Sequence, residues 1–169
     1  MTGISRNEAL SELEHFGIRG QNIYFIDFIP LVEMIWADGC AQEGERRVLD
    51  RYIRHHVARL NQMAGYDAFD LAAAQAFVES FLRDRPSPQL MRVLRQLVAA
   101  AGLAGGDKPH NEAARQSLLA VCLDIAASCT TSYPYGLDER FDANEKRCYF
   151  EILETLTETA VEAAADMRE

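Results

Sequence analysis

An acidic turn that leads into a helix-favouring segment occurs twice in this chain, 100 positions apart. The matched residues are Asp38 and Asp138, Glu45 and Glu145, Arg47 and Arg147, and Ile53 and Leu153. The first copy is the sharper of the two, because its turn reads Trp-Ala-Asp-Gly at residues 36–39. Such a repeat predicts a duplicated helical unit whose two copies carry paired carboxylate clusters.

Strand patterns are nearly absent. Alternating β-branched residues never persist, whereas Ala, Leu, Glu, Arg and Gln, which favour helix, dominate. We therefore expect an all-α fold: a single-domain bundle of about seven helices over residues 1–169, with half-repeats at roughly 23–101 and 110–160. The expected helices cover residues 5–16, 23–37, 42–64, a segment between 67 and 85, 88–101, 111–128 and 143–169.

Local signals refine these helices. Ser5 and Glu8 form the pattern of a capping box at the first helix. In the second, Pro30 leaves two alternatives: a kink at the proline, or a helix start near Asp27 that puts Pro30 in the first turn. The expected buried faces are Leu10, Leu13 and Phe16; Val48, Leu49, Tyr52, Ile53, His56, Leu60 and Met63; and Leu90, Met91, Leu94, Leu97 and Val98. Glu151, Glu154, Glu158 and Glu162 are interpreted as a solvated face of the last helix.

The acidic composition bears on partners. Twenty-six Asp plus Glu against 17 Lys plus Arg give a net charge of −9. A field of that sign repels phosphate backbones and anionic lipid, so we expect neither nucleic-acid binding nor membrane insertion. Cations and basic surfaces of protein partners are the expected ligands. The alternative is that the charge only keeps the protein in solution.

The four cysteines contain no CxxC pair, so we interpret them as reduced and structural. The N-terminus lacks the apolar core of a signal peptide. Together these two features predict a cytoplasmic protein. The longest apolar run, residues 23–37, is interrupted by Asp27 and Glu33 and is too short to span a bilayer. We expect a buried helix there.

The acidic turns are candidate cation sites. Hard cations such as Ca²⁺ and Mg²⁺ take oxygen ligands, and they fit a carboxylate cluster better than Zn²⁺ does. Gly39 permits a positive φ in the first turn, which lets main-chain carbonyls point inward. Glu33 lies five residues before Asp38, about 140° away on an ideal helix, so it joins only where Asp38 has left the helical path. The predicted ligands are Glu33, Asp38 and Glu45 in the first cluster and Asp124, Asp138, Asp142 and Glu145 in the second.

A simpler interpretation of the same residues is helix capping. Glu45 and Glu145 stand where a carboxylate favours a helix N-terminus, and Asp142 is a natural N-cap. Nearby arginines can neutralise these carboxylates as ordinary ion pairs. The EF-hand pattern is missing, which argues against a calcium sensor.

Motifs of catalysis are sparse. Glu12 and His15 form one Glu-x-x-His pair, but di-iron bundles need two. His55 and His56 are adjacent, so they point to different sides of a helix; we expect His56 to be buried and His55 to face solvent. Trp36 is interpreted as a core anchor rather than a ligand-stacking residue. No phosphate-binding loop, GxSxG turn or dinucleotide fingerprint is present.

Several segments together resemble the TerB-like family, all-helical proteins associated with bacterial tellurite resistance. The resemblance rests on residues 31–39, the helix start at 43–53, residues 85–88 with the following helix, and residues 141–146. It implies a helical bundle, a bacterial stress-response setting and divalent-cation binding at acidic helix ends. Cys40 stands where members often carry a further acid. Only Asp138 can stand for the second turn, because the chain has an insertion there.

Three functions remain open. The first is a non-enzymatic stress-response module, as the resemblance implies, that binds a divalent cation and docks to partner proteins. The second is a metal-free protein interaction domain whose acidic turns only cap helices. The third is a small metal-dependent enzyme, for which the sequence places no base or nucleophile around an open pocket.

Overall fold

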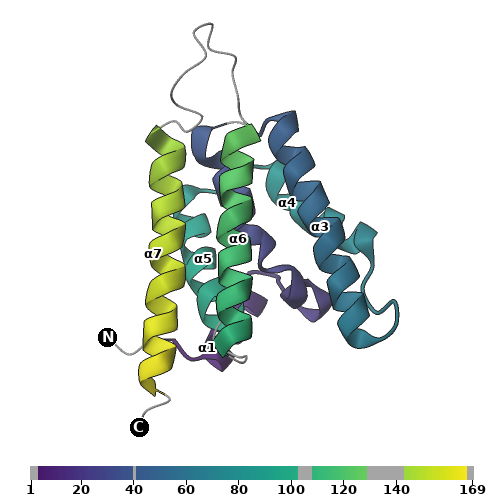
Figure 1. The fold of residues 1–169 in the computed structure, drawn as a ribbon, viewed down its shortest axis with the longest axis vertical. Coiled ribbons are helices and arrows are strands. Elements are labelled where there is room, and N and C mark those ends of the chain that lie inside the picture. Colours follow the sequence, from purple (N-terminus) through teal and green to yellow (C-terminus); the bar gives the residue numbers. More distant parts are fainter. Residues whose placement is uncertain (1–3, 40, 103–107, 129–142, 167–169) are drawn as a thin grey trace, which may run out of the picture.

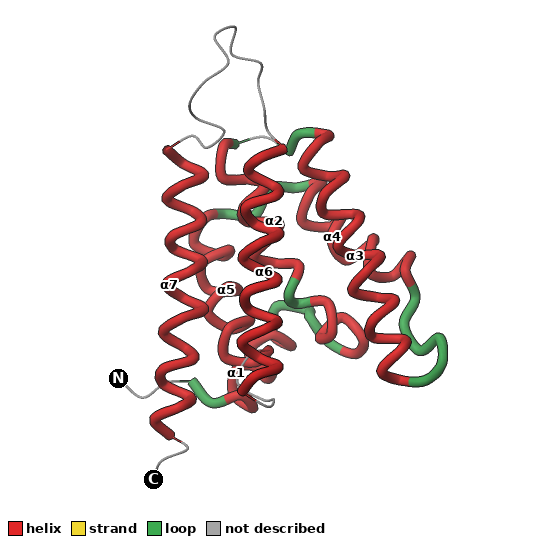
Figure 2. Tube along the Cα trace, in the orientation of Figure 1, coloured by secondary structure: helices red, strands yellow, loops and turns green. Residues whose placement is uncertain are grey.

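The computed structural model describes residues 4–39, 41–102, 108–128 and 143–166. Every regular element in these ranges is helical, which confirms the all-α prediction for the described part of the chain (Figures 1 and 2). The α-helices are α1 (Arg6–His15), α2 (Phe28–Ile35), α3 (Glu43–Ala64), α4 (Leu71–Arg83), α5 (Pro88–Gly102), α6 (Lys108–Ser128) and α7 (Ala143–Asp166), and the 3₁₀ helices are η1 (Gly20–Phe25) and η2 (Trp36–Asp38). No helix among the described residues is long and apolar enough to cross a membrane.

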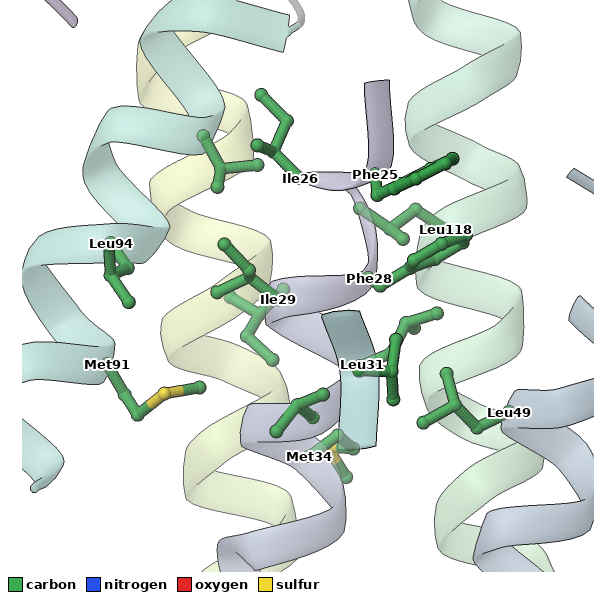
Figure 3. Packing of buried hydrophobic residues seen from close by; sticks show 14 of the residues in the cluster. Phe25, Ile26, Phe28, Ile29, Leu31, Met34, Leu49, Met91, Leu94 and Leu118 are labelled. Carbon is green, nitrogen blue, oxygen red and sulfur yellow. The ribbon is translucent and has the colours of Figure 1, made fainter. Parts of the chain in front are cut away.

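Helix α2 lies at the centre of the bundle. It packs against α3, α4, α5, α6 and α7, and seven of its eight residues are buried. The close-up of the core shows Phe28, Ile29, Leu31 and Met34 of this helix among side chains from its neighbours (Figure 3). Glu33 is the residue of α2 that is not fully buried, and it is the helix's one charged side chain. A carboxylate in this position must find a positive partner or lose its charge.

The predicted helix over residues 23–37 is divided. Residues 20–25 form η1, α2 begins at Phe28, and η2 follows it from Trp36. The second alternative for Pro30 is therefore correct: the proline lies in the first turn of α2, where its missing N–H costs no intrahelical hydrogen bond. Gly39 ends η2 with φ +94°, the left-handed conformation expected of this turn.

Local capping explains where the other helices begin. Ser5 Oγ accepts the Glu8 N–H at 3.3 Å in the predicted capping box, and Ser87 Oγ accepts the Leu90 N–H at 3.2 Å at the start of α5. Asp70 caps α4 through the Ala72 N–H at 3.1 Å. Helix α6 starts at Lys108, three residues earlier than predicted. Each cap satisfies main-chain groups that a helix end leaves unpaired.

Two residues predicted to be buried are exposed. Phe16 follows the last residue of α1 and is 45% exposed, because the turn at Gly17 carries the chain away from the core. Met63 is 69% exposed, since the C-terminal end of α3 projects beyond the helices on which its earlier turns pack (Figure 1). His56 is buried and His55 is exposed, as predicted.

The predicted duplication is only partly visible. Helices α3 and α7 begin at the same end of the bundle (Figure 1), and η2 contacts α7. The second acidic turn falls within residues 129–142, outside the described residues. The internal duplication and the single-domain organisation therefore stay predictions.

Candidate functional site

The predicted carboxylate ligands have different surroundings. Glu45 is fully buried, and its Oε2 accepts the main-chain N–H of Gln42 at 2.8 Å, so it caps α3. Glu145 is buried in the first turn of α7, whereas Asp124 is exposed on α6. Glu33 lies in α2 and is paired with an arginine, as described below.

Three predicted ligands cannot be placed. Asp138 and Asp142 lie outside the described residues, and of Asp38 only the main chain, in η2, is described. Among the described residues, no three His, Cys, Asp or Glu side chains form a group that could hold a metal ion. The described carboxylates thus do not form a cation site by themselves, and the seven-residue site stays a prediction that depends on Asp38, Asp138 and Asp142.

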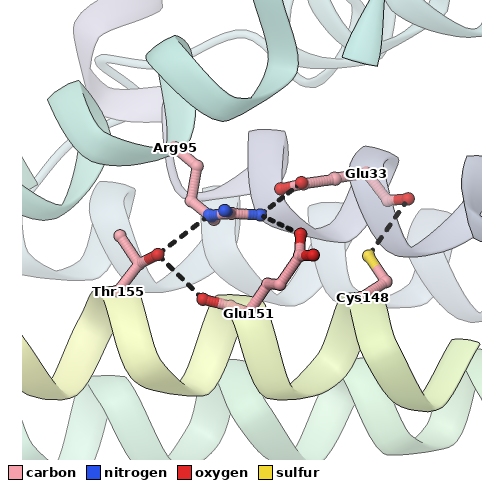
Figure 4. Close-up of polar contacts among 5 residues, drawn as sticks. All are labelled: Glu33, Arg95, Cys148, Glu151 and Thr155. Carbon is pink, nitrogen blue, oxygen red and sulfur yellow. Dashed lines mark hydrogen bonds and ion pairs between the residues drawn. The ribbon is translucent and has the colours of Figure 1, made fainter. Parts of the chain in front are cut away.

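Arg95 is the centre of the polar contacts around Glu33 (Figure 4). Its side chain is only 5% exposed, and its Nη1 binds Glu33 Oε1 and lies 3.6 Å from Glu151 Oε2. Its Nε donates to Thr155 Oγ1 at 3.0 Å, and that hydroxyl donates to the Glu151 carbonyl at 2.8 Å. One guanidinium therefore joins α2, α5 and α7 in the bundle interior.

The Glu33 carboxyl is held between two opposing effects. Burial raises its pKa, the positive charge of Arg95 lowers it, and the carboxylate of Glu151 raises it further, so that the pKa is about 7. Glu33 Oε2 is buried and has no hydrogen-bond partner among the described residues. An ionised oxygen in that position is costly because nothing replaces its hydration, which explains why burial prevails over Arg95.

A pocket of about 350 Å³ opens beside this centre. We call it the Glu33 pocket; its charged and aromatic lining residues are Glu33, Trp36, Arg85, Arg92, Arg147 and Glu151. These side chains come from α2, η2, the connection between α4 and α5, α5 itself and the first turns of α7. The pocket thus lies where the first acidic turn meets the start of α7.

Three arginines give the pocket a positive lining. Arg85 Nη2 donates to the Trp36 carbonyl at 3.2 Å, and its guanidinium carbon lies 5.6 Å from the centroid of the indole. Arg147 Nη2 donates to Asn144 Oδ1 at 3.4 Å. Arg92 is exposed and makes no hydrogen bond within the described part of the chain. The lining holds three arginines and two glutamates, a positive balance in a chain of net charge −9.

The thiol in this pocket is not activated. Cys148 Sγ donates to the Glu33 carbonyl at 3.7 Å, and burial raises the pKa of Cys148 to about 12. Cys122 is also buried, and burial raises its pKa as well. Both cysteines therefore remain protonated near neutral pH and behave as small apolar side chains.

Sequence reasoning missed Arg95 and misplaced Glu151. Arg95 falls on the apolar stripe of α5 with Met91, Leu94 and Val98, and a charge inside such a stripe was the signal that could have identified it. Glu151 was assigned to a solvated face; it is half-buried and ion-paired with Arg95, because α7 packs against α5 at that point.

Trp36 anchors η2, as the sequence had suggested. Its indole N–H donates to the Phe81 carbonyl at 3.1 Å, and its ring is half-buried against the core. The same ring lines the Glu33 pocket. It is therefore both a packing residue and a wall of the candidate site.

No protein-family model, curated protein or solved structure matches this chain. The TerB-like resemblance therefore stays a resemblance of the segments that carry it.

Proposed function

We propose that this chain is a non-enzymatic docking module whose Glu33 pocket receives an acidic segment of a partner protein. The observation that carries the proposal is the positive lining of the pocket: Arg85, Arg92 and Arg147 reach it from three separate parts of the chain. Guanidinium groups bind carboxylates through directed, charge-assisted hydrogen bonds. Arg92, which has no hydrogen bond within the described residues, is free to make such a bond.

The local charge supports a different partner from the one that the net charge suggests. The charge of −9 favours basic surfaces when the protein is considered as a whole. At physiological ionic strength, however, exposed charges more than about 8 Å apart are largely screened from each other. A ligand in the Glu33 pocket therefore responds mainly to the arginines around it, and these attract an anion.

The acidic residues described by the structure are compatible with a docking function that needs no metal ion. Glu45 caps α3, and Glu33 Oε1 binds Arg95, so each of these carboxylates has a partner other than a metal cation. Divalent-cation binding and a bacterial stress-response setting are implied by the resemblance alone and remain predictions. Under our proposal, millimolar Ca²⁺, Mg²⁺ or Mn²⁺ leaves the melting temperature unchanged. A rise that Asp38→Ala abolishes would restore the cation-binding interpretation.

The docking proposal can be tested with the fluorescence of Trp36, the only tryptophan in the chain and a wall of the pocket. Peptides of six glutamates, six glutamines or six lysines are titrated at low and high salt. We expect the glutamate peptide alone to bind saturably, and its affinity to fall as salt rises.

Charge-matched variants locate the binding. Arg92→Gln and Arg147→Gln should each weaken the glutamate peptide about two- to five-fold, as expected for one exposed charge pair. Arg51→Gln is the control, because Arg51 is exposed on α3 and does not line the pocket. Equal binding of the glutamine peptide, or an equal loss in the Arg51 variant, would reject the docking site.

A further inference from the structure

A second cavity, of about 500 Å³, lies on another part of the bundle, between α1, η1, α3 and the adjoining ends of α5 and α6. We call it the Asp27 cavity; the residues that determine its chemistry are Asp27, Arg59, Leu10, Ile23, Leu60 and Met63. Its volume falls in the range of small-molecule sites, about 300–1,000 Å³. Its lining combines one carboxylate, Asp27, and two guanidinium groups, Arg59 and Arg6, with an apolar wall. Arg6 Nε donates to the Ala101 carbonyl at 3.2 Å, whereas Arg59 lies near Asp27.

Asp27 is a half-buried carboxylate without a direct partner. It stands between η1 and α2, and within the described residues it makes no hydrogen bond or ion pair. Burial raises its pKa, and the nearby His56 and Arg59 only partly offset that effect. A carboxylate that lines a cavity in this state favours a ligand that brings a positive charge or a hydrogen-bond donor.

His56 does not supply a hydrogen bond or a positive charge to Asp27. Its Nδ1 lies 3.1 Å from Arg59 Nη2, and its Nε2 lies 3.0 Å from the Tyr24 carbonyl. A guanidinium can only donate, so Nδ1 accepts and Nε2 carries the proton, which makes the ring neutral. Burial lowers the pKa of His56, in agreement with this tautomer.

Arg59 carries a positive charge in the same cavity. It donates to His56, which leaves other N–H groups of its guanidinium for a ligand. Within the described part of the chain it forms no ion pair with Asp27, although both residues line the cavity. A carboxylate and a guanidinium therefore face one space without touching.

The remaining wall is apolar. Leu10, Ile23 and Leu60 are half-buried, and Met63 is largely exposed beside them. Apolar side chains that line a cavity next to charged groups accommodate the body of a ligand, while the charged groups orient its polar end.

We propose that the Asp27 cavity binds a free α-amino acid with an apolar side chain. The ammonium group contacts Asp27, the carboxylate contacts Arg59, and the side chain lies against Leu10, Ile23 and Leu60. A zwitterion supplies a partner to Asp27 and to Arg59 without adding net charge to the site, while Arg6 keeps its hydrogen bond to the Ala101 carbonyl. This site is separate from the Glu33 pocket and does not depend on the docking function.

The first test uses the unmodified protein and three matched probes. L-leucine, N-acetyl-L-leucine and L-leucinamide are titrated by calorimetry at about pH 6.5, below the pKa of an α-amino group. The acetyl compound lacks the ammonium group, and the amide lacks the carboxylate. We expect leucine to bind most tightly and each derivative about 10- to 100-fold more weakly, since each leaves one buried charge without its partner.

Two variants identify the residue behind each loss. In Asp27→Asn, leucine should bind as weakly as N-acetyl-leucine does; in Arg59→Gln, it should bind as weakly as leucinamide does. Asp84→Asn, an exposed carboxylate outside the cavity, should retain normal binding. Circular dichroism checks that each variant is folded.

Several results would overturn the proposal, and the first two need no variant. The first is that the unmodified protein binds none of leucine, isoleucine, methionine and phenylalanine at millimolar concentration. The second is that all three leucine probes bind equally. The third is that folded Asp27→Asn binds leucine with normal affinity.

Discussion

Replacing Glu33 with glutamine should remove a specific pH dependence from the stability of the protein. The side chain is only 13% exposed and lies in α2, of which seven of the eight residues are buried. Its pKa is raised from the ordinary value of 4.5 to about 7, chiefly by burial. Because the folded-state pKa lies above the unfolded one, the contribution of Glu33 is fully favourable below about pH 4.5 and is lost as pH rises through about 7.

The magnitude follows from that pKa. One pKa unit corresponds to about 1.36 kcal/mol, so a rise from 4.5 to about 7 corresponds to about 3 kcal/mol of stability lost across this interval. Glutamine has nearly the same shape and does not titrate. Relative to the unmodified protein, Glu33→Gln should therefore gain about 3 kcal/mol in free energy of unfolding between about pH 4 and pH 8.

Urea denaturation at intervals across this pH range measures the effect. The quantity of interest is the difference in free energy of unfolding between the two proteins at each pH, because titrations that both proteins share then cancel. Glu154→Gln, an exposed position on the same helix as Glu151, is the control and should show no such trend. A difference for Glu33→Gln that stays constant with pH would refute the burial argument.

Three further substitutions test the contacts that hold the helices together. Arg95→Met should lower the free energy of unfolding by about 1–2 kcal/mol at neutral pH, because it removes the guanidinium's hydrogen bonds to Glu33 and Thr155 while Glu33 takes up a proton; an unchanged urea midpoint would contradict this. Glu45→Ala should cost about 1–2 kcal/mol by removing a buried cap, whereas the exposed control Glu43→Ala should cost about 0.5 kcal/mol. Equal losses would rule out the capping role. Gly39→Ala should lower the melting temperature, since φ +94° disfavours a residue with a Cβ by roughly 1 kcal/mol; a higher melting temperature would argue against the left-handed turn.

Most of the helical structure could be predicted because its determinants are local. Capping residues such as Ser5, Asp70 and Ser87 act on N–H groups two or three positions away, and glycines end helices through their own dihedral angles. These effects leave a direct trace in neighbouring letters of the sequence. The division of residues 23–37 was also among the predicted alternatives, because Pro30 restricts where α2 can begin.

The candidate sites could be predicted from the sequence only to a small extent. The sequence identified Glu33 as a candidate ligand but did not identify its partners. Arg95 is 62 positions from Glu33, and Glu151 belongs to another helix. The same holds for Asp27 and Arg59, whose meeting at one cavity depends on how η1 lies against α3. Which side chains come together in this way is set by the packing of the helices against one another.

The sequence alone thus determined an all-helical chain, the positions of its main turns and the acidic character of the first one. The tertiary structure decided which charges are paired, buried or exposed. The physical reason is that helix formation depends on contacts within one or two turns, whereas the state of a carboxylate such as Glu33 depends on how much water and which opposite charge the folded chain leaves beside it.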